Sequence, residues 1–451
     1  WSAAMDTPTI EKAGLNPLRP DLERINSATS IAELIKLSAE FNTKGSSTFF
    51  VNNIAQDDKN SEKMAYILTQ GGLGMPNRDY YIDNDEKTLF VRKAFVEYLI
   101  KTFQQLGNDI NSARKIADQV LQLETRLAKA SRKLADLRDP YKNYNKMNLQ
   151  KLQSLTPELN WNDYLVVSNV KSLDSVIVGQ PEFFTALNNE LKSTPLEVWK
   201  NYMKYNYIND FAPYLDNVTY TNYFNFNKTI NGAQSPRPRW KRVLDSEEGS
   251  IGEALGQLFV KEYFSENAKK RYENLVESIR EAYKERIQKL TWMSDSTKAK
   301  ALDKLAKITK KVGYPDKWKD FSSLNISKNS YVENIQKSNQ WWHNYNVNKL
   351  GKPVDRTEWD MTPQTYNAYY NPSNNEIVLP AGIFAVPGKK DEDLDDALVY
   401  GYAAASTIGH EITHGFDDQG RQYDAKGNLA NWWAKKDEEE FNKRAQMIIR
   451  Q

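Results

Sequence analysis

The chain has 451 residues, which is long enough for two or three domains and a sizeable hydrophobic core. Its 61 Lys and Arg residues nearly balance its 59 Asp and Glu residues, so the net charge of +2 excludes recruitment to nucleic acid or an anionic membrane by bulk charge. The sequence has no cysteine, which excludes disulfides, thiolate metal ligands and cysteine nucleophiles, so any metal ion must be held by histidine and carboxylate side chains.

The start of the chain carries no recognisable targeting signal. No basic segment followed by an apolar one begins at Trp1, and no apolar run in the sequence reaches the roughly 20 residues of a membrane-spanning helix. Because the first residue is not methionine, we expect a processed or trimmed piece whose export signal, if there is one, lies outside this sequence. The lack of cysteine fits a cytosolic protein or an exported bacterial one.

Helical patterns dominate the first 345 residues. Residues 1 to about 70 predict short helices and turns, and residues 88–136 predict two amphipathic helices broken near the middle. Residues 141–235 alternate short helical stretches with turns. The longest helical pattern follows at residues 250–310, where apolar residues recur at helical spacing between charged ones.

The pattern changes after Gly351. Residues 366–370 and 376–380 are rich in aromatic and β-branched residues, and they predict two short strands joined by a turn. The acidic run at residues 391–396 suits the N-terminus of a helix, which we expect to continue to His414.

The most specific signal in the chain is the pentapeptide His410-Glu411-Ile412-Thr413-His414 at the end of that helix. Side chains four residues apart lie on one face of a helix, so both imidazoles can bind one zinc ion. The carboxylate of Glu411 cannot reach the same ion from its angle, but it can take a proton from the attacking water. The alternative is an ordinary pair of histidines beside a helical glutamate, although two of the chain's three histidines are spent here.

Two histidines do not complete a catalytic zinc site, which normally has three protein ligands and a water. Asp417 and Asp418 follow His414 too closely to reach the same ion easily. The glutamates at residues 438–440 can in principle fold back from the next helix, but a solvated charged face is the simpler interpretation. The residues alone therefore predict two of three ligands.

Motifs spread over most of the chain carry a resemblance to a known family. They are Gly74-Met75-Pro76-Asn77-Arg78-Asp79-Tyr80-Tyr81, Arg138-Asp139-Pro140, Ala254-Leu255-Gly256-Gln257-Leu258, Gly313-Tyr314-Pro315-Asp316, Asn367-Ala368-Tyr369-Tyr370, Pro380-Ala381-Gly382-Ile383 and the run from Ile408 to Arg421. Together they resemble the neprilysin-like zinc metallopeptidases, which include neprilysin, the endothelin-converting enzymes and the bacterial O-type oligopeptidases. The chain is similar to a bacterial member that lacks both ends.

The resemblance implies a mostly α fold with two portions. A large helical portion at residues 1–345 would cover the N-terminal part of a thermolysin-like, gluzincin-type catalytic portion with a few short strands at residues 346–451. The two portions would enclose a cavity that admits peptides. The implied function is that of a zinc-dependent endopeptidase with one catalytic zinc ion, which cuts oligopeptides on the N-terminal side of bulky apolar residues.

The resemblance also implies partners and a location. The expected partners are peptide substrates, with no nucleic acid and no membrane span in this chain. The expected location is the bacterial periplasm, the cell surface or the medium, with the cytoplasm as the alternative.

Matching positions imply the roles of individual residues. His410 and His414 would bind zinc, and Glu411 would be the general base towards water and later the proton donor to the leaving amine. Two interpretations of Asp417 stay open. It either orients a zinc-binding histidine from behind or forms a structural salt bridge at the end of the helix.

Upstream, Asn367 and the backbone of Ala368 match the family's strand that holds the substrate as an added strand. Ile383 would border the pocket for the residue after the scissile bond. The family's third zinc ligand is the Glu of an E-x-x-x-D motif, which would lie beyond Gln451, so the missing C-terminal segment of the same enzyme is an expected partner. The alternative is a catalytically incomplete helical scaffold or peptide-binding fragment that needs a second segment to hold zinc.

The third histidine, His343, stands beside Trp341 and Trp342. It either lines a substrate chamber or packs as a structural histidine, and the aromatic neighbours favour the second interpretation.

Overall fold

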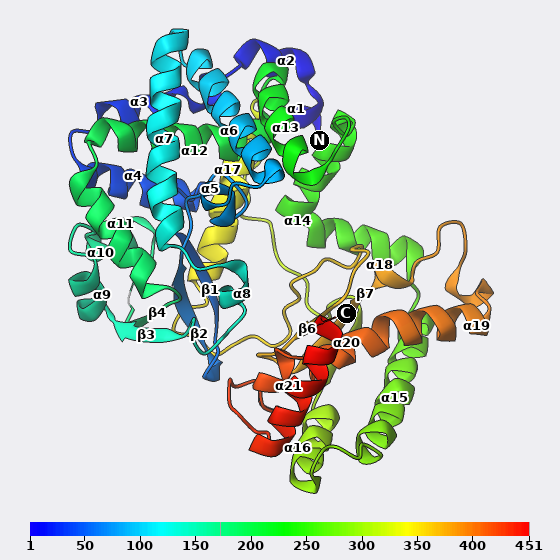
Figure 1. Cartoon of the computed structure of the whole chain (residues 1–451). Coiled ribbons are helices and arrows are strands. Elements are labelled where there is room, and N and C mark those ends of the chain that lie inside the picture. Colours follow the sequence, from blue (N-terminus) through cyan, green and yellow to red (C-terminus); the bar gives the residue numbers. More distant parts are fainter. Residues whose placement is uncertain (172, 451) are drawn as a thin grey trace. The chain divides into compact units, whose positions relative to one another are not determined.

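The structure is a computed structural model that describes residues 1–171 and 173–450, without the side chains of residues 403–405. Helices predominate and the strands are short (Figure 1), which confirms the predicted mostly α fold. The chain forms two compact units. Unit 1 comprises Trp1–Ala55, Ala65–Ser250 and Ser322–Lys352, and unit 2 comprises Gln56–Met64, Ile251–Phe321 and Pro353–Gln451.

The two units interleave along the sequence, whereas the sequence predicts one boundary between residues 345 and 346. Residues 251–321 form elements that pack with the segment after residue 353, so this part of the predicted helical portion belongs to unit 2. Periodicity identifies the buried face of a helix but not the element that covers it. The functional division into a covering and a catalytic portion stays a prediction.

Unit 1 is built mainly from helices, several of them long. They are α1 (Ser2–Met5), α2 (Thr7–Ala13), η1 (Asn16–Leu18), α3 (Arg19–Ser27), α4 (Ile31–Thr43), α5 (Asp79–Ile82), α6 (Glu86–Gln105), α7 (Ile110–Ala130), α8 (Leu134–Leu137), α9 (Leu149–Leu155), α10 (Trp161–Val167), α11 (Pro181–Ser193), α12 (Leu196–Phe211), η2 (Ala212–Tyr214), α13 (Asn217–Asn231) and α17 (Tyr331–Val347). Helix α14 (Arg239–Tyr263) crosses from unit 1 to unit 2, and its backbone is not helical at Ile251, the first residue of the second segment of unit 2.

Helices α6 and α7 confirm the predicted amphipathic pair. They pack against each other, and the turn between them contains Gly107. Its φ of +91° is a backbone conformation that glycine adopts readily and other residues rarely do. Asp109 caps α7 by accepting hydrogen bonds from the backbone N–H groups of Asn111 and Ser112. The apolar side chains of α7 are buried at helical spacing, as the sequence predicts.

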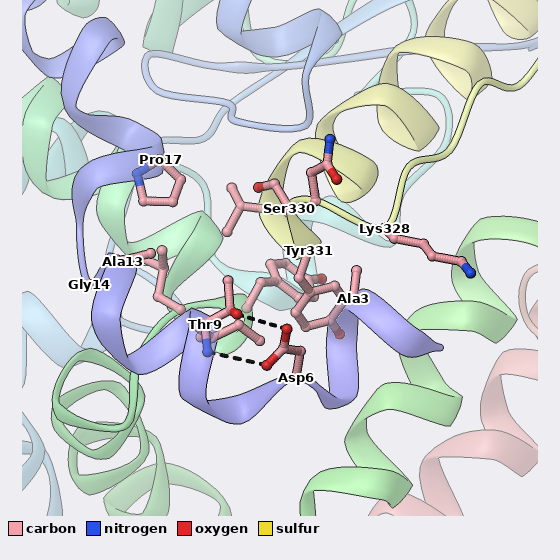
Figure 2. A pocket seen from close by; sticks show the side chains of 14 residues that line it. Ala3, Asp6, Thr9, Ala13, Gly14, Pro17, Lys328, Ser330 and Tyr331 are labelled. Carbon is pink, nitrogen blue, oxygen red and sulfur yellow. Dashed lines mark hydrogen bonds between the residues drawn. The ribbon is translucent and has the colours of Figure 1, made fainter.

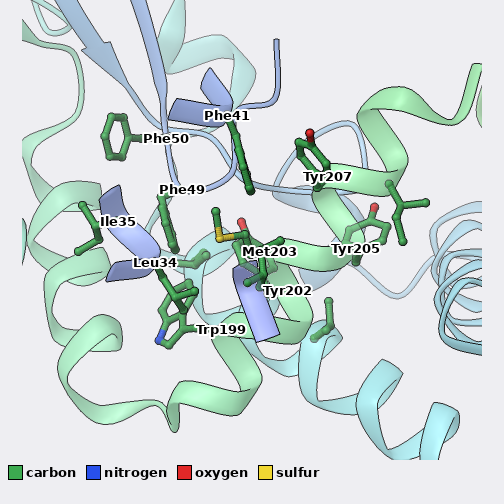
Figure 3. Packing of buried hydrophobic residues seen from close by; sticks show 14 of the residues in the cluster. Leu34, Ile35, Phe41, Phe49, Phe50, Trp199, Tyr202, Met203, Tyr205 and Tyr207 are labelled. Atoms are coloured by element: carbon green, nitrogen blue, oxygen red, sulfur yellow. The ribbon is translucent and has the colours of Figure 1, made fainter. Parts of the chain in front are cut away.

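The core of unit 1 is rich in aromatic residues (Figure 3). Phe49 packs against Trp199 with ring centroids 5.4 Å apart, and Phe41 packs against Tyr207 at 4.4 Å. The side chains of α12 are buried on all sides of the helix, so this helix forms the centre of unit 1.

A four-stranded sheet in the order β1-β2-β4-β3 was not predicted. Its strands are β1 (Val51–Asp57), β2 (Asn60–Thr69), β3 (Asn145–Asn148) and β4 (Ser175–Val178). β2 and β4 pair in parallel, and β3 and β4 pair antiparallel. Both β1 and β2 lie in the stretch up to residue 70 for which the sequence predicts short helices and turns, and residues 58–59 form the turn that joins them.

Unit 2 holds the zinc motif and a three-stranded sheet in the order β5-β7-β6. The strands are β5 (Thr309–Gly313), β6 (Tyr369–Asn371) and β7 (Glu376–Pro380), and the helices are α15 (Glu266–Gln288), α16 (Asp295–Ala306), α18 (Ala381–Phe384), η3 (Asp391–Asp393), α19 (Asp396–Leu398), η4 (Val399–Ile408), α20 (Gly409–His414), η5 (Gly420–Gln422) and α21 (Lys435–Ile449). β7 is buried along its whole length, pairing in parallel with β5 and antiparallel with β6. The two predicted strands are confirmed, while β5 was expected to continue a helix.

The predicted zinc helix is assembled from three successive pieces, α19, η4 and α20. It begins at Asp396, where Asp395 caps it by accepting a hydrogen bond from the Ala397 backbone N–H. The middle piece, η4, is a π-helix, which periodicity does not predict. Within residues 1–171 and 173–450, none of the helices combines the length and apolar character that crossing a membrane requires.

Candidate metal centre

The two imidazoles of the motif meet on one face of α20. The Nε2 atoms of His410 and His414 are 3.1 Å apart, and the rings are perpendicular with centroids 4.7 Å apart. This arrangement follows from the four-residue spacing, which places the second ring one turn beyond the first.

The geometry of this pair fits a zinc ion. At a zinc–nitrogen distance of about 2.05 Å, two nitrogens 3.1 Å apart subtend about 98° at a common ion. A tetrahedral site requires about 109°, so a shift of a few tenths of an ångström brings both imidazoles into ligand position. The donor set, two imidazole nitrogens and no thiolate, is one that zinc accepts.

Asp417 holds the second imidazole from behind. Its Oδ2 atom lies 2.7 Å from Nδ1 of His414, and its Oδ1 atom accepts hydrogen bonds from the backbone N–H groups of Gln419 at 3.0 Å and Gly420 at 2.8 Å. The Nδ1–H group of His414 can donate to this carboxylate, which leaves Nε2 as the lone-pair nitrogen that a metal needs. Of the two open interpretations, the contact favours an orienting role.

Glu411 lies between the two histidines in sequence and is 6% exposed. Burial raises the pKa of its carboxyl group above the ordinary value, while the positive charge that His414 and His410 carry when protonated lowers it. Among the residues that the structure describes, none donates a hydrogen bond to this side chain. The carboxylate is therefore available to a bound molecule.

The predicted substrate strand reaches the site through β6. Asn367 is exposed and Ala368 is buried, and both immediately precede β6, which packs against α20. β6 is an edge strand, because β7 lies on one side of it and no further strand of the described residues pairs with the other. Ile383 of α18 is 8% exposed within the core of unit 2, so little of its side chain can touch a peptide.

Two models of peptidase family M13 match the chain, one over residues 1–315 and the other over residues 367–451. The chain belongs to peptidase family M13. The endothelin-converting enzyme homolog of Locusta migratoria is 34% identical over 418 residues, which cover 88% of this M13 chain and 57% of that protein. Human endothelin-converting enzyme 1 is 30% identical over 473 residues, which cover 100% of this chain and 61% of the relative.

Solved structures agree with this family assignment. Zinc metalloprotease ZMP1 of Mycobacterium tuberculosis, solved with an inhibitor, superposes with a TM-score of 0.93 at 36% identity and covers 99% of this chain and 67% of that one. PepO of Lactobacillus rhamnosis superposes with a TM-score of 0.90 at 22% identity, and the match covers 98% of this chain and 70% of the PepO chain. At this identity the likeness supports the fold alone. The resemblance to the neprilysin-like enzymes is thus confirmed. The M13 chain spans 53% to 62% of the length of its curated relatives.

Within the described part of the M13 chain, two candidate ligands come together, His410 and His414. Among the described residues, no group of three or more His, Cys, Asp or Glu side chains is placed to hold a metal ion. Glu438 instead pairs with Arg421 at 3.4 Å, and Glu440 pairs with Arg444 at 2.9 Å. These ion pairs fit the interpretation of α21 as a charged face.

One residue beside the motif escaped sequence reasoning. Tyr283 of α15 donates a hydrogen bond to the Gly409 carbonyl at 2.7 Å and contacts the hydroxyl of Thr413. Through these contacts Tyr283 connects α15 to α20 of the M13 chain. Tyr283 lies in the stretch at residues 250–310 that the sequence predicts to be helical, but periodicity does not show where a phenolic hydroxyl points.

The remaining histidine lies in unit 1 and is packed. Nε2 of His343 is 2.8 Å from the Ser168 carbonyl oxygen, and burial lowers its pKa. This arrangement favours the structural interpretation.

Unit 1 also contains a small cavity of about 40 Å³, lined by Asp6, Thr9 and Tyr331 among others (Figure 2). Asp6 caps α2 there by accepting hydrogen bonds from the backbone N–H and the hydroxyl of Thr9. The lining of this cavity includes no histidine.

Proposed function

We propose that this chain is part of a zinc-dependent endopeptidase whose metal is bound by His410 and His414. The observation that carries the proposal is the pair of Nε2 atoms 3.1 Å apart, of which the second belongs to a ring fixed through Nδ1 by Asp417. When bound, zinc supplies Lewis-acid activation of water and of a peptide carbonyl group. The family assignment supports a peptidase, and the ZMP1 structure is that of a zinc metalloprotease.

The chain's own residues would handle the substrate and its protons. Glu411 would accept a proton from the attacking water and pass it to the leaving amine, because it is buried beside both imidazoles and has no competing hydrogen-bond donor among the described residues. Its raised pKa suits a group that must both take and return a proton.

The exposed edge next to Asn367 would hold the peptide. An extended substrate can add to β6 as a further strand, with main-chain hydrogen bonds that give affinity and little sequence preference. The exposed amide of Asn367 would add a contact to the peptide backbone. Ile383 would border the pocket for the residue after the scissile bond.

The substrates we propose are oligopeptides cut on the N-terminal side of bulky apolar residues. The family assignment supports a peptidase, and an edge strand such as β6 can pair with a substrate that is extended. We propose the bacterial periplasm, the cell surface or the medium as the location, since the lack of cysteine fits an exported bacterial protein, with the cytoplasm as the alternative.

A second candidate function rests on the incomplete ligand set. With two ligands among the described residues, the chain would be a peptide-binding scaffold that holds zinc only together with a further segment. That segment would supply a carboxylate ligand. The missing C-terminal segment of the same enzyme is the partner we propose for this role.

Zinc content and peptide cleavage test both candidates. We expect the purified chain to bind one zinc ion, to lose peptide cleavage when a chelator removes it, and to recover when Zn²⁺ is added but not when Mg²⁺ is added, because Mg²⁺ prefers oxygen ligands. Mass spectrometry of the products locates the cleaved bonds. Cleavage that survives complete zinc removal contradicts the first candidate, and stoichiometric zinc on the chain alone contradicts the second.

A further inference from the structure

A buried lysine lies beneath the loop that follows the zinc helix. Lys304 of α16 is 1% exposed, and its ammonium donates hydrogen bonds to the carbonyl oxygens of Gly420 at 2.6 Å and Tyr423 at 2.7 Å. Aromatic rings of Tyr370, Phe416 and Trp432 surround it at 5.7, 5.8 and 5.9 Å. Lysine is almost never fully buried unless its charge is used.

Gly420 joins this lysine to the zinc motif. Its carbonyl oxygen accepts from Lys304, and its N–H donates to Oδ1 of Asp417 at 2.8 Å. The other oxygen of Asp417 contacts Nδ1 of His414 at 2.7 Å. Position 420 requires glycine, because a Cβ there would collide with the His414 carbonyl oxygen. The chain of contacts from Lys304 to the imidazole therefore passes through Gly420 and Asp417.

A second branch leads from Lys304 to the edge strand. The Lys304 carbonyl accepts a hydrogen bond from the side-chain amide of Asn375 at 3.1 Å, and the Asn375 side-chain oxygen accepts one from the hydroxyl of Tyr370 at 2.8 Å. Tyr370 lies in β6, two residues after Ala368. The same lysine thus touches the supports of both the metal ligand and the peptide edge.

We propose that Lys304 is a positioning residue, which holds the loop over residues 415–423 so that Asp417 keeps the Nδ1–H form of His414 and presents Nε2 to the metal. The inference rests on the proposed zinc site and names a further residue on which that site depends. It explains why a cation is kept in a position that an apolar side chain of similar volume would fill at lower desolvation cost. Burial lowers the pKa of Lys304 to about 7 against the charges of Asp424 and Asp417, which is a measure of that cost.

The test compares Lys304→Met with Lys300→Met in the purified chain. Lys300 lies one turn earlier in α16 and donates to the Trp432 carbonyl at 3.1 Å, so it controls for the loss of a lysine-to-carbonyl bond that does not lead to Asp417. Zinc affinity is measured by competition with a chelator. We expect about 10–100-fold weaker zinc binding in Lys304→Met, as for loss of a group that orients a metal ligand, and a change below twofold in Lys300→Met.

A thermodynamic cycle separates positioning from general loosening of unit 2. If Lys304 acts through Asp417, the double variant Lys304→Met/Asp417→Asn binds zinc no more weakly than Asp417→Asn alone. Additive losses would mean that Lys304 does not act through Asp417. Should Lys304→Met fail to fold, Lys304→Leu also removes the donor with a shorter apolar side chain, and zinc affinity equal to that of the wild type in this variant would overturn the proposal.

A metal-free readout keeps the inference distinct from the proposed function. Nitrogen NMR of the His414 imidazole in the metal-free chain is expected to show the Nδ1–H tautomer in the wild type and a mixture of tautomers in Lys304→Met. If the wild type binds no zinc but the tautomer responds in this way, the zinc function of this chain alone is wrong and the positioning role stands. An unchanged tautomer together with unchanged zinc affinity overturns the positioning role.

Discussion

Two of the buried glutamates, Glu124 in unit 1 and Glu411 in unit 2, have opposite surroundings. Glu124 of α7 in unit 1 is 0% exposed, and its Oε2 atom accepts hydrogen bonds from the Tyr81 hydroxyl and from the Gly74 N–H at 3.0 Å. Glu411 of α20 in unit 2 is 6% exposed and receives no hydrogen bond from the described residues. Burial raises the pKa of both carboxyl groups, to about 8 for Glu124.

This difference separates a structural carboxyl group from a reactive one. The hydrogen bonds that Glu124 accepts from Gly74 and Tyr81 connect the loop before α5 to α7 in unit 1. This carboxyl group therefore has a structural role. The carboxyl group of Glu411 is committed to no intramolecular partner among the described residues and stands beside two imidazoles. A raised pKa alone therefore does not identify a catalytic group, and the available partners decide its role.

The largest expected effect is on catalysis. We expect Glu411→Gln to lower the rate of peptide cleavage by about 10²–10⁴-fold, because an amide cannot accept the proton of the attacking water, while zinc binding and thermal stability stay close to those of the wild type. The matched variant Glu124→Gln should leave the cleavage rate within about twofold. Initial rates on one peptide check both, and more than a tenth of the wild-type rate in Glu411→Gln would contradict the assigned role.

The next largest effect is on stability, and here we expect a substitution of Glu124 to have a larger effect than one of Glu411. Glu124→Ala leaves the buried donors of Tyr81 and Gly74 unpaired, and we expect unit 1 to lose about 2–6 kcal/mol, at about 1–3 kcal/mol for each unsatisfied group. Glu411→Ala should cost less than about 1 kcal/mol, since it leaves no donor of the described residues unpaired. Urea unfolding followed with probes in each unit measures both, and equal losses would remove the distinction.

Individual buried groups in the two units should also contribute opposite pH dependences to stability. Glu124 and Asp210 of unit 1 have pKa values raised by burial to about 8 and about 7, whereas their ordinary values are 4.5 and 3.8. Between these limits the folded state binds more protons than the unfolded state, so the contribution of these two groups to stability falls as the pH rises from about 5 to 8. The slope is at most about 1.4 kcal/mol per pH unit and per group. Glu124→Gln should remove the contribution of Glu124 to this pH dependence, which pH-dependent unfolding of unit 1 measures.

Lys304 in unit 2 contributes a pH dependence of the opposite sign. Its pKa is lowered by burial from 10.5 to about 7, so between these values the unfolded state binds the extra proton. The contribution of Lys304 to stability is therefore most unfavourable below pH 7 and improves as the pH rises towards 10. Thermal unfolding of the wild type and of Lys304→Met across this pH range measures the contribution of Lys304. If stability changes with pH in the same way in both proteins, Lys304 does not titrate in this range.

The contrast between the two glutamates also shows what the sequence can and cannot reveal. The spacing of His410 and His414 fixes their common helix face locally, and it correctly predicts that the imidazoles meet. The helices around Gly107 follow from equally local signals. Glu124 in α7 has no such signal, because its partners Tyr81 and Gly74 lie 43 and 50 residues away in the sequence.

Long-range contacts also explain the other omissions. Lys304 occupies a charged, helical stretch that is typical of a solvated face, yet Gly420 and Tyr423 lie 116 and 119 residues further on. Strand β5 was expected to be helical because its five residues follow a long helical pattern, and its pairing with β7 outweighs local propensity. Family resemblance named Asp417, but only the structure joins it to Gly420.

The smallest expected effect concerns the hydroxyl that anchors the zinc helix. Tyr283→Phe removes the hydrogen bond to the Gly409 carbonyl and keeps the ring, so unit 2 should lose about 0.5–1.5 kcal/mol. Tyr263→Phe is the matched control, because Tyr263 is 65% exposed and the same atom is deleted in water. If the anchor also sets the direction of α20, Tyr283→Phe should lower the cleavage rate several-fold with zinc affinity unchanged, since the carboxylate of Glu411 moves relative to the substrate while both imidazoles move together. Weaker zinc binding in this variant would instead mean that the anchor fixes the imidazole pair itself.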